Sequence, residues 1–416
     1  MNFKNTKICI LGLGYVGLPL AIEFSKKLSV IGFDIDKKKI NLLKKKHGRI
    51  IKFTSTKKNL KEANIFIVTV PTPIDSKKKP NLKPLKNVSM IISKVLKKGD
   101  LVIYESTVYP GLTEEVCIPI LKKKNNLKLN KDFFVGYSPE RVSPGDKNDF
   151  TRINKVISGS NNKTTNFIFK LYKKIIKANL FRASSIKVAE ASKIIENVQR
   201  DINISFMNEI SLIFSKLNID TQEVLEAAKT KWNFLNFSPG LVGGHCISVD
   251  PYYLTYKAKQ KKYTPKVILS GRTINDSMGF YVGKTILKKI QKKFHKKKIN
   301  LGIFGLTFKE NTKDIRDSKA FDIIKTLKKN KKIRIFAYDP NLKNEDLDQK
   351  LNIDLNKKYR KLDVLVLAVP HREFLNFNYR KINSLLNRNG TLIDICLLYT
   401  SPSPRDRQKS RMAGCA

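Results

Sequence analysis

The sequence is poor in cysteine and contains no long apolar run, and both shortages exclude classes of protein. It has five cysteines among 416 residues: Cys9, Cys117, Cys246, Cys396 and Cys415. They are too scattered for a disulfide framework, and no CxxC pair suggests a zinc site. No apolar stretch reaches the ~18–20 residues that a membrane span needs. We therefore expect a cytoplasmic protein without a bound metal.

Acidic residues are also scarce, since 35 Asp and Glu face 82 Lys and Arg, for a net charge of +47. A nucleic-acid partner is one interpretation of this charge. The other is compositional bias, because Lys, Ile and Asn are all abundant, as in proteins from AT-rich genomes. The lysines are spread along the chain, and no aromatic-interleaved RNA motif accompanies them. We favour bias, although the charge would still attract anionic ligands such as nucleotide diphosphates.

The length predicts two or three domains rather than one core. Strand-like segments alternate with helices over residues 1–185, which predicts a doubly wound parallel sheet. A helical period follows over 186–293 and predicts a long central helix with a possible dimer interface. The alternating pattern restarts over 294–395. The expected fold class is α/β, with two Rossmann-like parallel-sheet domains joined by the long helix.

The last 21 residues, 396–416, differ from the rest of the chain. They hold three Arg to one Lys and lack Ile and Asn, whereas the body prefers Lys. We interpret them as an assembly artefact that resembles a translated sequencing adapter; the alternative is a disordered Ser/Pro/Arg tail. On the first interpretation the native sequence departs from this one at about Cys396.

A dinucleotide-binding pattern lies near the N-terminus. Gly12, Gly14 and Gly17 form G-x-G-x-x-G after an apolar strand run and before a helical stretch, and Asp34 ends the next strand run. The glycines allow a tight turn, close approach of pyrophosphate and close packing of helix on strand. An acid at Asp34 favours NAD over NADP, although Lys39 stands nearby. The alternative is a glycine-rich turn without a ligand.

Three later loops follow strand runs and are expected at the carboxyl edge of the same sheet: Val70–Pro73, Glu105–Thr107 and Ser138–Glu140. Ligands bind at that edge in open parallel sheets. We expect these loops to line the nicotinamide and the reacting carbon. Each one alone is also consistent with a turn that caps a helix.

The segment GLVGGHCISVDP places Cys246 among glycines, which allow a substrate to approach closely. Asp250 follows one helical turn later, near the thiol. The alternative is a small buried hydrophobic residue, but the polar setting favours a nucleophile. His245 is either a general base or a packing residue. Lys193 and Asn197 lie four residues apart and share one helix face, which is either functional or solvated.

Together these motifs resemble the UDP-glucose/GDP-mannose dehydrogenase family. The resemblance covers residues 7 to about 395 and is carried by ILGLGYVGLPLA, ESTVYPG, YSPERV, AEASKIIENVQRDINISFMNE, GGHCISVDPYYL, GRTIND and GLTFKENTKDIRDS. The Glu196–Asn197 and Arg200–Asp201 pairs, His245 and VDPYYLTYKA resemble the UDP-N-acetylhexosamine branch. That branch supplies uronic acids for capsule or O-antigen polysaccharide.

The resemblance implies a four-electron oxidation of a sugar CH2OH by two NAD, through a thiohemiacetal and a thioester on Cys246. It implies that Lys193 stabilises an oxyanion with help from Asn197, and that Asp250 activates water or tunes Lys193. Glu140 becomes the candidate base for the hydrolytic water, which Thr107 positions. The implied cofactor-binding residues are Gly12, Gly14, Tyr15, Val16, Gly17, Asp34, Lys39, Thr72, Thr107 and Arg316. The implied substrate-binding residues are Glu140, Arg141, Lys193, Asn197, Arg200, Gly243, Arg272, Asn275, Phe308 and Lys309.

In the family the second Rossmann-like domain holds the UDP, and the resemblance implies a homodimer or higher oligomer whose Arg272 segment serves the partner's site. Two positions depart from the family pattern. Ser248 stands where many members have Pro, and Pro144 replaces the second acid of UDP-glucose members. The second departure argues against UDP-glucose as the substrate.

Three alternatives stay open. The first is the same chemistry on UDP-glucose or GDP-mannose. The second is a non-catalytic, basic nucleic-acid-binding protein on a dehydrogenase fold. The third is a family member that the foreign tail makes inactive. The sequence does not separate the gluco epimer of the sugar from the galacto epimer, and it fixes neither the oligomeric state nor the final polysaccharide.

Overall fold

The computed structural model describes residues 6–123, 126–142, 149–295, 298–347, 355 and 361–395. The chain divides into two compact units. Unit 1 comprises Met1–Asn197 and Tyr252–Thr264, and unit 2 comprises Val198–Pro251 and Pro265–Ala416. The helical segment 186–293 is thus shared between the units. The unusual tail, 396–416, lies outside the described residues, as does Pro144.

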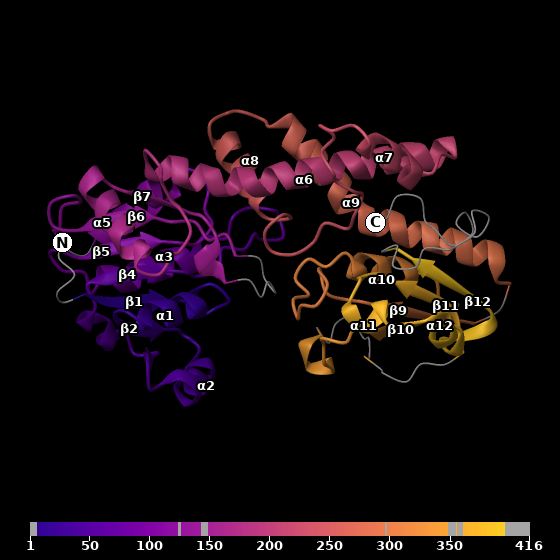
Figure 1. The fold of residues 1–416 in the computed structure, drawn as a ribbon, viewed down its shortest axis with the longest axis horizontal. Coiled ribbons are helices and arrows are strands. Elements are labelled where there is room, and N and C mark those ends of the chain that lie inside the picture. Colours follow the sequence, from indigo (N-terminus) through magenta and orange to yellow (C-terminus); the bar gives the residue numbers. More distant parts are fainter. Residues whose placement is uncertain are drawn as a thin grey trace. The chain divides into compact units, whose positions relative to one another are not determined.

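Unit 1 contains an eight-stranded sheet in the order β3-β2-β1-β4-β5-β6-β7-β8 (Figure 1). Its strands are β1 (Lys7–Leu11), β2 (Ser29–Phe33), β3 (Lys52–Thr54), β4 (Ile65–Val68), β5 (Leu101–Tyr104), β6 (Phe134–Tyr137), β7 (Lys155–Gly159) and β8 (Leu180–Arg182). The order reverses between β1 and β4, which is the point where open parallel sheets bind ligands. The strands β4 and β5 are apolar and buried throughout, because helices cover both faces.

The helices of unit 1 connect these strands and pack on the sheet (Figure 1). They are α1 (Gly17–Ser25), α2 (Lys37–His47), α3 (Lys83–Ser93), α4 (Ile118–Lys122) and α5 (Asn162–Lys173). One pair of strands departs from the parallel pattern, since β6 and β7 are antiparallel. The described part of their connection carries a 3-10 turn, Phe150–Arg152, and a parallel pairing needs a long crossover, usually a helix.

The long helix expected from the sequence is α6 (Ile186–Leu217). It is followed by α7 (Thr221–Lys229), α8 (Asp250–Gln260) and α9 (Lys266–Lys293). The long central helix predicted from the sequence is therefore confirmed, whereas residues 230–249 form turns and coil rather than helix. Within the described ranges, no helix is both long and apolar enough to cross a membrane.

Unit 2 contains the second parallel sheet, in the order β10-β9-β11-β12. Its elements are β9 (Ile299–Phe304), α10 (Ala320–Lys328), β10 (Ile333–Tyr338), β11 (Leu362–Leu367), α11 (Arg372–Leu375), α12 (Tyr379–Leu385) and β12 (Leu386–Asp394). All three strand pairs are parallel. The fold class predicted from the sequence, two Rossmann-like sheets with a long helix between them in sequence, is confirmed.

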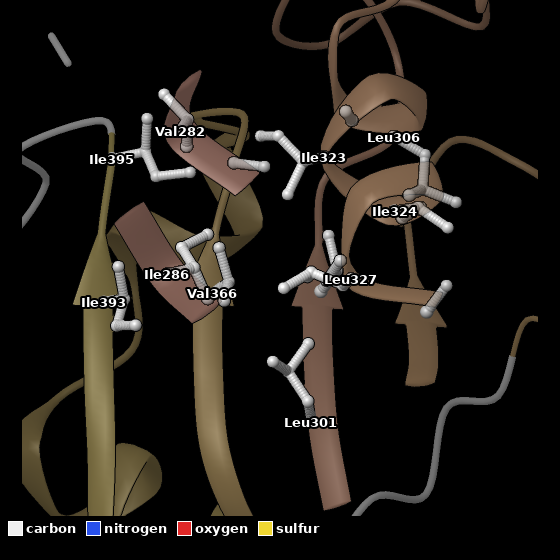
Figure 2. Close-up of a cluster of buried hydrophobic side chains, with 14 of the residues drawn as sticks. Val282, Ile286, Leu301, Leu306, Ile323, Ile324, Leu327, Val366, Ile393 and Ile395 are labelled. Carbon is white, nitrogen blue, oxygen red and sulfur yellow. The ribbon is translucent and has the colours of Figure 1, made fainter. Parts of the chain in front are cut away.

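Successive residues of β11 face opposite sides of this sheet, as the two-residue period of a strand requires. Val364 and Val366 join a core with α9 and α10, to which Val282 and Ile324 contribute. Figure 2 shows these helical side chains above the strand side chains. The alternate residues of β11 pack on the other face with α12. The loops at the carboxyl ends of the strands are left to form a site.

Candidate functional site

The glycines of the Gly12–Gly17 turn have different roles: Gly12 and Gly17 allow close packing, whereas Gly14 leaves space for a ligand. Gly12 has a φ of +101°, a left-handed conformation that favours glycine. A Cβ at Gly17 would lie 2.0 Å from the Gly12 carbonyl oxygen and 2.4 Å from Thr69 Oγ1, so α1 approaches the strand too closely for a side chain. A Cβ at Gly14 would meet no atom within 4 Å. Gly14 and Tyr15 are exposed, which leaves the backbone at the start of α1 open to a phosphate.

Asp34 closes this turn. Its Oδ2 accepts the Leu13 amide at 3.0 Å, and its Oδ1 accepts the Asp36 amide at 3.0 Å. Lys39 Nζ lies 2.9 Å from Oδ2. Partial burial opposes ionisation, but the bonds from Lys39 and the two amides hold the pKa of Asp34 below its usual value. An ionised acid here suits a ribose with free hydroxyls, so the residues present fit NAD.

Two of the three predicted loops are bonded to each other. Ser106 Oγ donates to the carbonyl of Val70 at 2.7 Å and joins the loops after β4 and β5. Tyr137, at the end of β6, donates to the Ser106 carbonyl at 3.2 Å. Thr72 is buried and its carbonyl accepts the Tyr253 hydroxyl at 3.0 Å, whereas Thr107 is half-buried. The carboxyl ends of these neighbouring strands therefore gather in one place, as the sequence predicted.

Glu140, in the third loop, is held from two sides. Its Oε1 accepts the amides of the next two residues, both at 2.6 Å. Its Oε2 lies 3.9 Å from Lys155 Nζ. Lys155 is buried and lies 2.9 Å from Glu105 Oε2, and the Tyr172 hydroxyl donates to the other oxygen of Glu105. Burial raises the pKa of Glu105, which Lys155 opposes. Sequence reasoning missed Lys155, although a lysine that opens an apolar strand run was a signal.

Lys193 and Asn197 both face inward from α6. Lys193 is 8% exposed, yet its ammonium makes no hydrogen bond or ion pair within the described part of the chain. Asn197 is fully buried. Nearby in unit 1, Arg141 donates to the Asn154 carbonyl at 3.1 Å and pairs with Glu196 of α6. The low exposure of Lys193 argues against a solvated face.

In unit 2, Cys246 lies in a turn immediately before α8. Its carbonyl accepts the Val249 amide at 3.1 Å and the Asp250 amide at 2.9 Å, so Asp250 stands one helical turn away, as predicted. Among the cysteines of the described ranges, only Cys246 is partly exposed. Burial raises the pKa of the thiol of Cys9 strongly and that of Cys117 to about 12, which keeps both protonated.

The glycines before Cys246 are required by close packing on the loop after β9. A Cβ at Gly243 would lie 2.7 Å from the Asp317 carbonyl oxygen. Gly244 has a φ of +86°, and a Cβ there would lie 2.6 Å from two ring atoms of Phe308. The Gly244 amide also donates to the Arg316 carbonyl at 3.1 Å. The cysteine turn is therefore built against the Phe308–Asp317 segment.

That segment borders a cavity of about 250 Å³ at the carboxyl end of the second sheet. Its lining residues are Gly240, Leu241, Thr307, Phe308, Lys309, Glu310, Ser318, Lys319, Ala320, Ala368, Val369, Pro370 and Ile395. Sites that enclose a whole drug-sized ligand have ~300–1,000 Å³, so this volume suits part of a nucleotide. Two predicted substrate residues, Phe308 and Lys309, line it.

Arg272 and Asn275 lie on α9 and are fully buried. Arg272 donates to Asp201 Oδ1 of α6 at 2.6 Å and pairs with Asp276, and Asn275 donates to Asp201 Oδ1 at 2.8 Å. Burial raises the pKa of Asp201 despite these partners. Arg200, by contrast, is exposed on α6. The structure thus places Arg272 and Asn275 in a polar network between two helices of unit 2.

Arg316, predicted to contact the cofactor, is 47% exposed in the loop after β9. Its Nε donates to Asp314 Oδ1 at 2.9 Å. Burial opposes ionisation of Asp314, but the bonds from Arg316 keep its pKa below the usual value. Arg316 belongs to unit 2, whereas the glycine turn belongs to unit 1.

Three models of the UDP-glucose/GDP-mannose dehydrogenase family match the chain: the NAD binding domain over residues 6–52 and 41–176, the central domain over 187–277, and the UDP binding domain over 302–401. The UDP-N-acetyl-D-glucosamine 6-dehydrogenase of Pseudomonas aeruginosa is 47% identical over 409 residues, covering 94% of this chain and 97% of that protein. Protein CapL of Staphylococcus aureus is 45% identical, covering 94% and 96%. The solved structure of a UDP-D-ManNAc dehydrogenase from Pyrococcus horikoshii is 30% identical, covers 96% and 97%, and has a TM-score of 0.83.

Proposed function

The chain belongs to the UDP-glucose/GDP-mannose dehydrogenase family and is an NAD-dependent nucleotide-sugar dehydrogenase, and from this premise we propose that it oxidises C6 of a UDP-N-acetylhexosamine to the carboxylate. The name of the Pseudomonas relative supports N-acetylglucosamine as the sugar. The product is a UDP-linked uronic acid for a surface polysaccharide, capsule or O-antigen.

The main support for this proposal is the position of Phe308 between the cavity and the cysteine turn of unit 2. Phe308 lines the cavity and also contacts the cysteine turn at Gly244. A nucleotide held in the cavity therefore has its attached sugar in reach of the segment that presents Cys246. The partial exposure of this thiol supports the role of nucleophile, which buried cysteines do not fill.

The proposed reaction forms and breaks one bond to sulfur. The Gly12–Gly17 turn and Asp34 would hold NAD, which would supply the hydride acceptor for each of two oxidations, so each sugar would consume two NAD. The first oxidation removes the hydroxyl proton and a hydride from C6 and leaves an aldehyde. The Cys246 thiolate adds to its carbon, and the oxygen takes a proton. Loss of that proton and a second hydride leaves a thioester, which water cleaves to the carboxylate and the free thiol.

The buried ammonium of Lys193 is proposed to stabilise the negative oxygen that develops on C6 in the addition and hydrolysis steps. A preorganised cation in a dry site is worth far more than one in water. The low exposure of Lys193, whose side chain faces inward from α6 with that of Asn197, supports this role. Asn197 assists it, Asp250 tunes Lys193 or activates water, Glu140 serves as the base for the hydrolytic water and Thr107 positions that water.

We also propose that the three segments of the chain have different roles: residues 1–185 bind NAD, residues 186–293 contribute to catalysis and assembly, and residues 294–395 bind the UDP-sugar.

The proposed assembly is a homodimer through α6. Phe206, Ile213 and Leu217 follow one another at helical spacing and are 54%, 48% and 59% exposed. A second copy of this apolar stripe is self-complementary across a twofold axis. Phe206→Glu should give a monomer by light scattering; a dimer unchanged by it would contradict this interface.

The proposed function is tested by NADH release from UDP-N-acetylglucosamine, UDP-N-acetylgalactosamine, UDP-glucose and GDP-mannose. We expect two NADH per UDP-N-acetylhexosamine and the highest kcat/KM on one of these two sugars. Preference for UDP-glucose or GDP-mannose would replace the substrate assignment. Salt-sensitive DNA binding without NADH release would favour a non-catalytic protein and contradict the proposal.

A further inference from the structure

One histidine of unit 2 connects the loops at the carboxyl end of the second sheet. His371 follows β11, is fully buried, and its ring has partners in the loops after β9 and β10. Its Nε2 lies 3.0 Å from Asp339 Oδ2, after β10, and 3.2 Å from Thr307 Oγ1, after β9. Its Nδ1 accepts the Asn311 amide at 2.9 Å, and the Asn341 side-chain amide lies 3.0 Å away.

These partners assign the proton of the imidazole. A backbone amide such as that of Asn311 only donates, so Nδ1 must present a lone pair. The proton therefore sits on Nε2 and points to the Asp339 carboxylate. Bonds to His371 and to two backbone amides hold the pKa of Asp339 below its usual value, against the effect of burial. One neutral ring thus accepts on one side and donates on the other.

The turn at the Asn311 end depends on this ring. Asn311 has a φ of +57°, a left-handed conformation that is uncommon outside glycine. Besides the bond from its amide to His371, its side-chain oxygen accepts the Arg372 amide at 3.0 Å. The residues just before it, Thr307 to Glu310, line the cavity. His371 therefore bonds to the left-handed turn that ends a wall of the cavity.

Asp339 in unit 2 corresponds in position to Asp34 in unit 1, because each accepts a backbone amide from the loop after the first strand of its sheet. The Gly305 amide donates to the Tyr338 carbonyl at 2.8 Å and the Leu306 amide to Asp339 Oδ2 at 2.7 Å. The same two bonds join Gly12 to Phe33 and Leu13 to Asp34 in unit 1. Asp34 is paired with the half-exposed Lys39, whereas His371 seals Asp339. The Asp339 carboxylate is therefore not accessible to a ribose, and its bonds hold the loop after β9 in place.

We propose that His371 is a positioning residue that holds the Thr307–Asn311 wall in the shape that binds the nucleotide end of the substrate. This inference rests on the proposed function, since it takes the cavity as the UDP site. Without His371 the wall would adopt the binding shape only part of the time, and apparent affinity falls by that fraction. If the wall is formed ~1–10% of the time, UDP binds about 10- to 100-fold more weakly.

Two substitutions of His371 test separately its bond to the Asn311 amide and its bond to the Asp339 carboxylate. In His371→Gln the side-chain amide can still donate to Asp339 but leaves the Asn311 amide unpaired. In His371→Asn the shorter side chain can accept from Asn311 but does not reach Asp339. Asn341→Ala removes one outer bond and is the mild variant if the histidine variants fold poorly. Asn387→Ala is the matched control, because it removes a bond of 2.8 Å to Asp363 at the opposite end of the same sheet.

The measurement is calorimetric titration of the full-length protein with UDP and separately with NAD, with KM and kcat for the nucleotide sugar. We expect both histidine variants to bind UDP about 10- to 100-fold more weakly and Asn341→Ala about 2- to 5-fold more weakly. NAD affinity should not change, KM should rise more than kcat falls, and Asn387→Ala should bind UDP like the wild type. Wild-type UDP affinity in all three variants would overturn the inference alone. A wild type that does not bind UDP would overturn the proposed function and the inference with it.

Discussion

The packing of Gly244 on Phe308 predicts a specific cost for Gly244→Ala. At a φ of +86° any side chain adds about 1–2 kcal/mol of backbone strain. The new Cβ would also lie 2.6 Å from the Phe308 ring, and forcing the ring away costs about 1–3 kcal/mol. The sum is a loss of about 2–5 kcal/mol of unfolding free energy. Since Cys246 is two residues away, a shift of ~1 Å would also lower kcat about 100-fold.

Two comparisons separate the cost of the clash with Phe308 from the cost of backbone strain. Gly99 has a φ of +90°, but a Cβ there would meet nothing within 4 Å, so Gly99→Ala should show the strain alone. In a Phe308→Ala background, Gly244→Ala should likewise lose only the strain term, which a double-mutant cycle in denaturant measures. If Gly244→Ala costs no more than Gly99→Ala and keeps wild-type kcat, the close packing of the cysteine turn is not what positions the thiol.

Three further predictions concern unit 1. Gly14→Ala should change the unfolding free energy by less than about 0.5 kcal/mol and should raise KM for NAD. Gly17→Ala should lower the unfolding free energy by about 3 kcal/mol, because its Cβ has no room. Equal effects of the two variants on stability would contradict these separate roles. Asp34→Asn should raise the NADP/NAD ratio of kcat/KM about tenfold or more, since Lys39 then meets the 2′-phosphate, and Lys39→Ala in that background should reverse the gain. Burial raises the pKa of Glu190 to about 7, so its folded form binds the proton more tightly than the unfolded chain. Unfolding free energy should therefore fall by about 3 kcal/mol as pH rises from ~4.5 to ~7, and Glu190→Gln, measured by denaturation across that range, should lack this fall.

Local patterns allowed much of unit 1 to be predicted. The turn from Gly12 to Gly17 and the acid Asp34 involve adjacent segments whose chemistry is visible in the sequence. The sequence did not predict that the Leu13 amide donates to Asp34. The short strands β7 and β8 were not predicted. Lys155 begins β7 and Arg182 ends β8, so the apolar part of each strand is short, and the pairing of the two strands depends on residues distant in sequence.

The contacts that shape the site in unit 2 are long-range, and this is why the sequence did not reveal them. Gly243 and Gly244 hinted at close packing, but nothing local named Phe308, which is 64 residues after Gly244, as the neighbour. His371 meets Thr307 from 64 positions away and Asp339 from 32. Such contacts depend on the order of the strands in the sheet, and periodicity does not supply that order.

The central claim is that Cys246 carries the sugar as a thioester, and intact-protein mass spectrometry with NADH counting tests it most directly. With UDP-N-acetylglucosamine and NAD, the wild type should release two NADH per sugar, and a rapid quench should trap a thioester adduct on Cys246. Cys246→Ser should accumulate little acid, because its ester forms and hydrolyses poorly, and Cys9→Ala should keep wild-type stoichiometry. Robust release of two NADH per sugar by Cys246→Ala would contradict covalent catalysis by this residue.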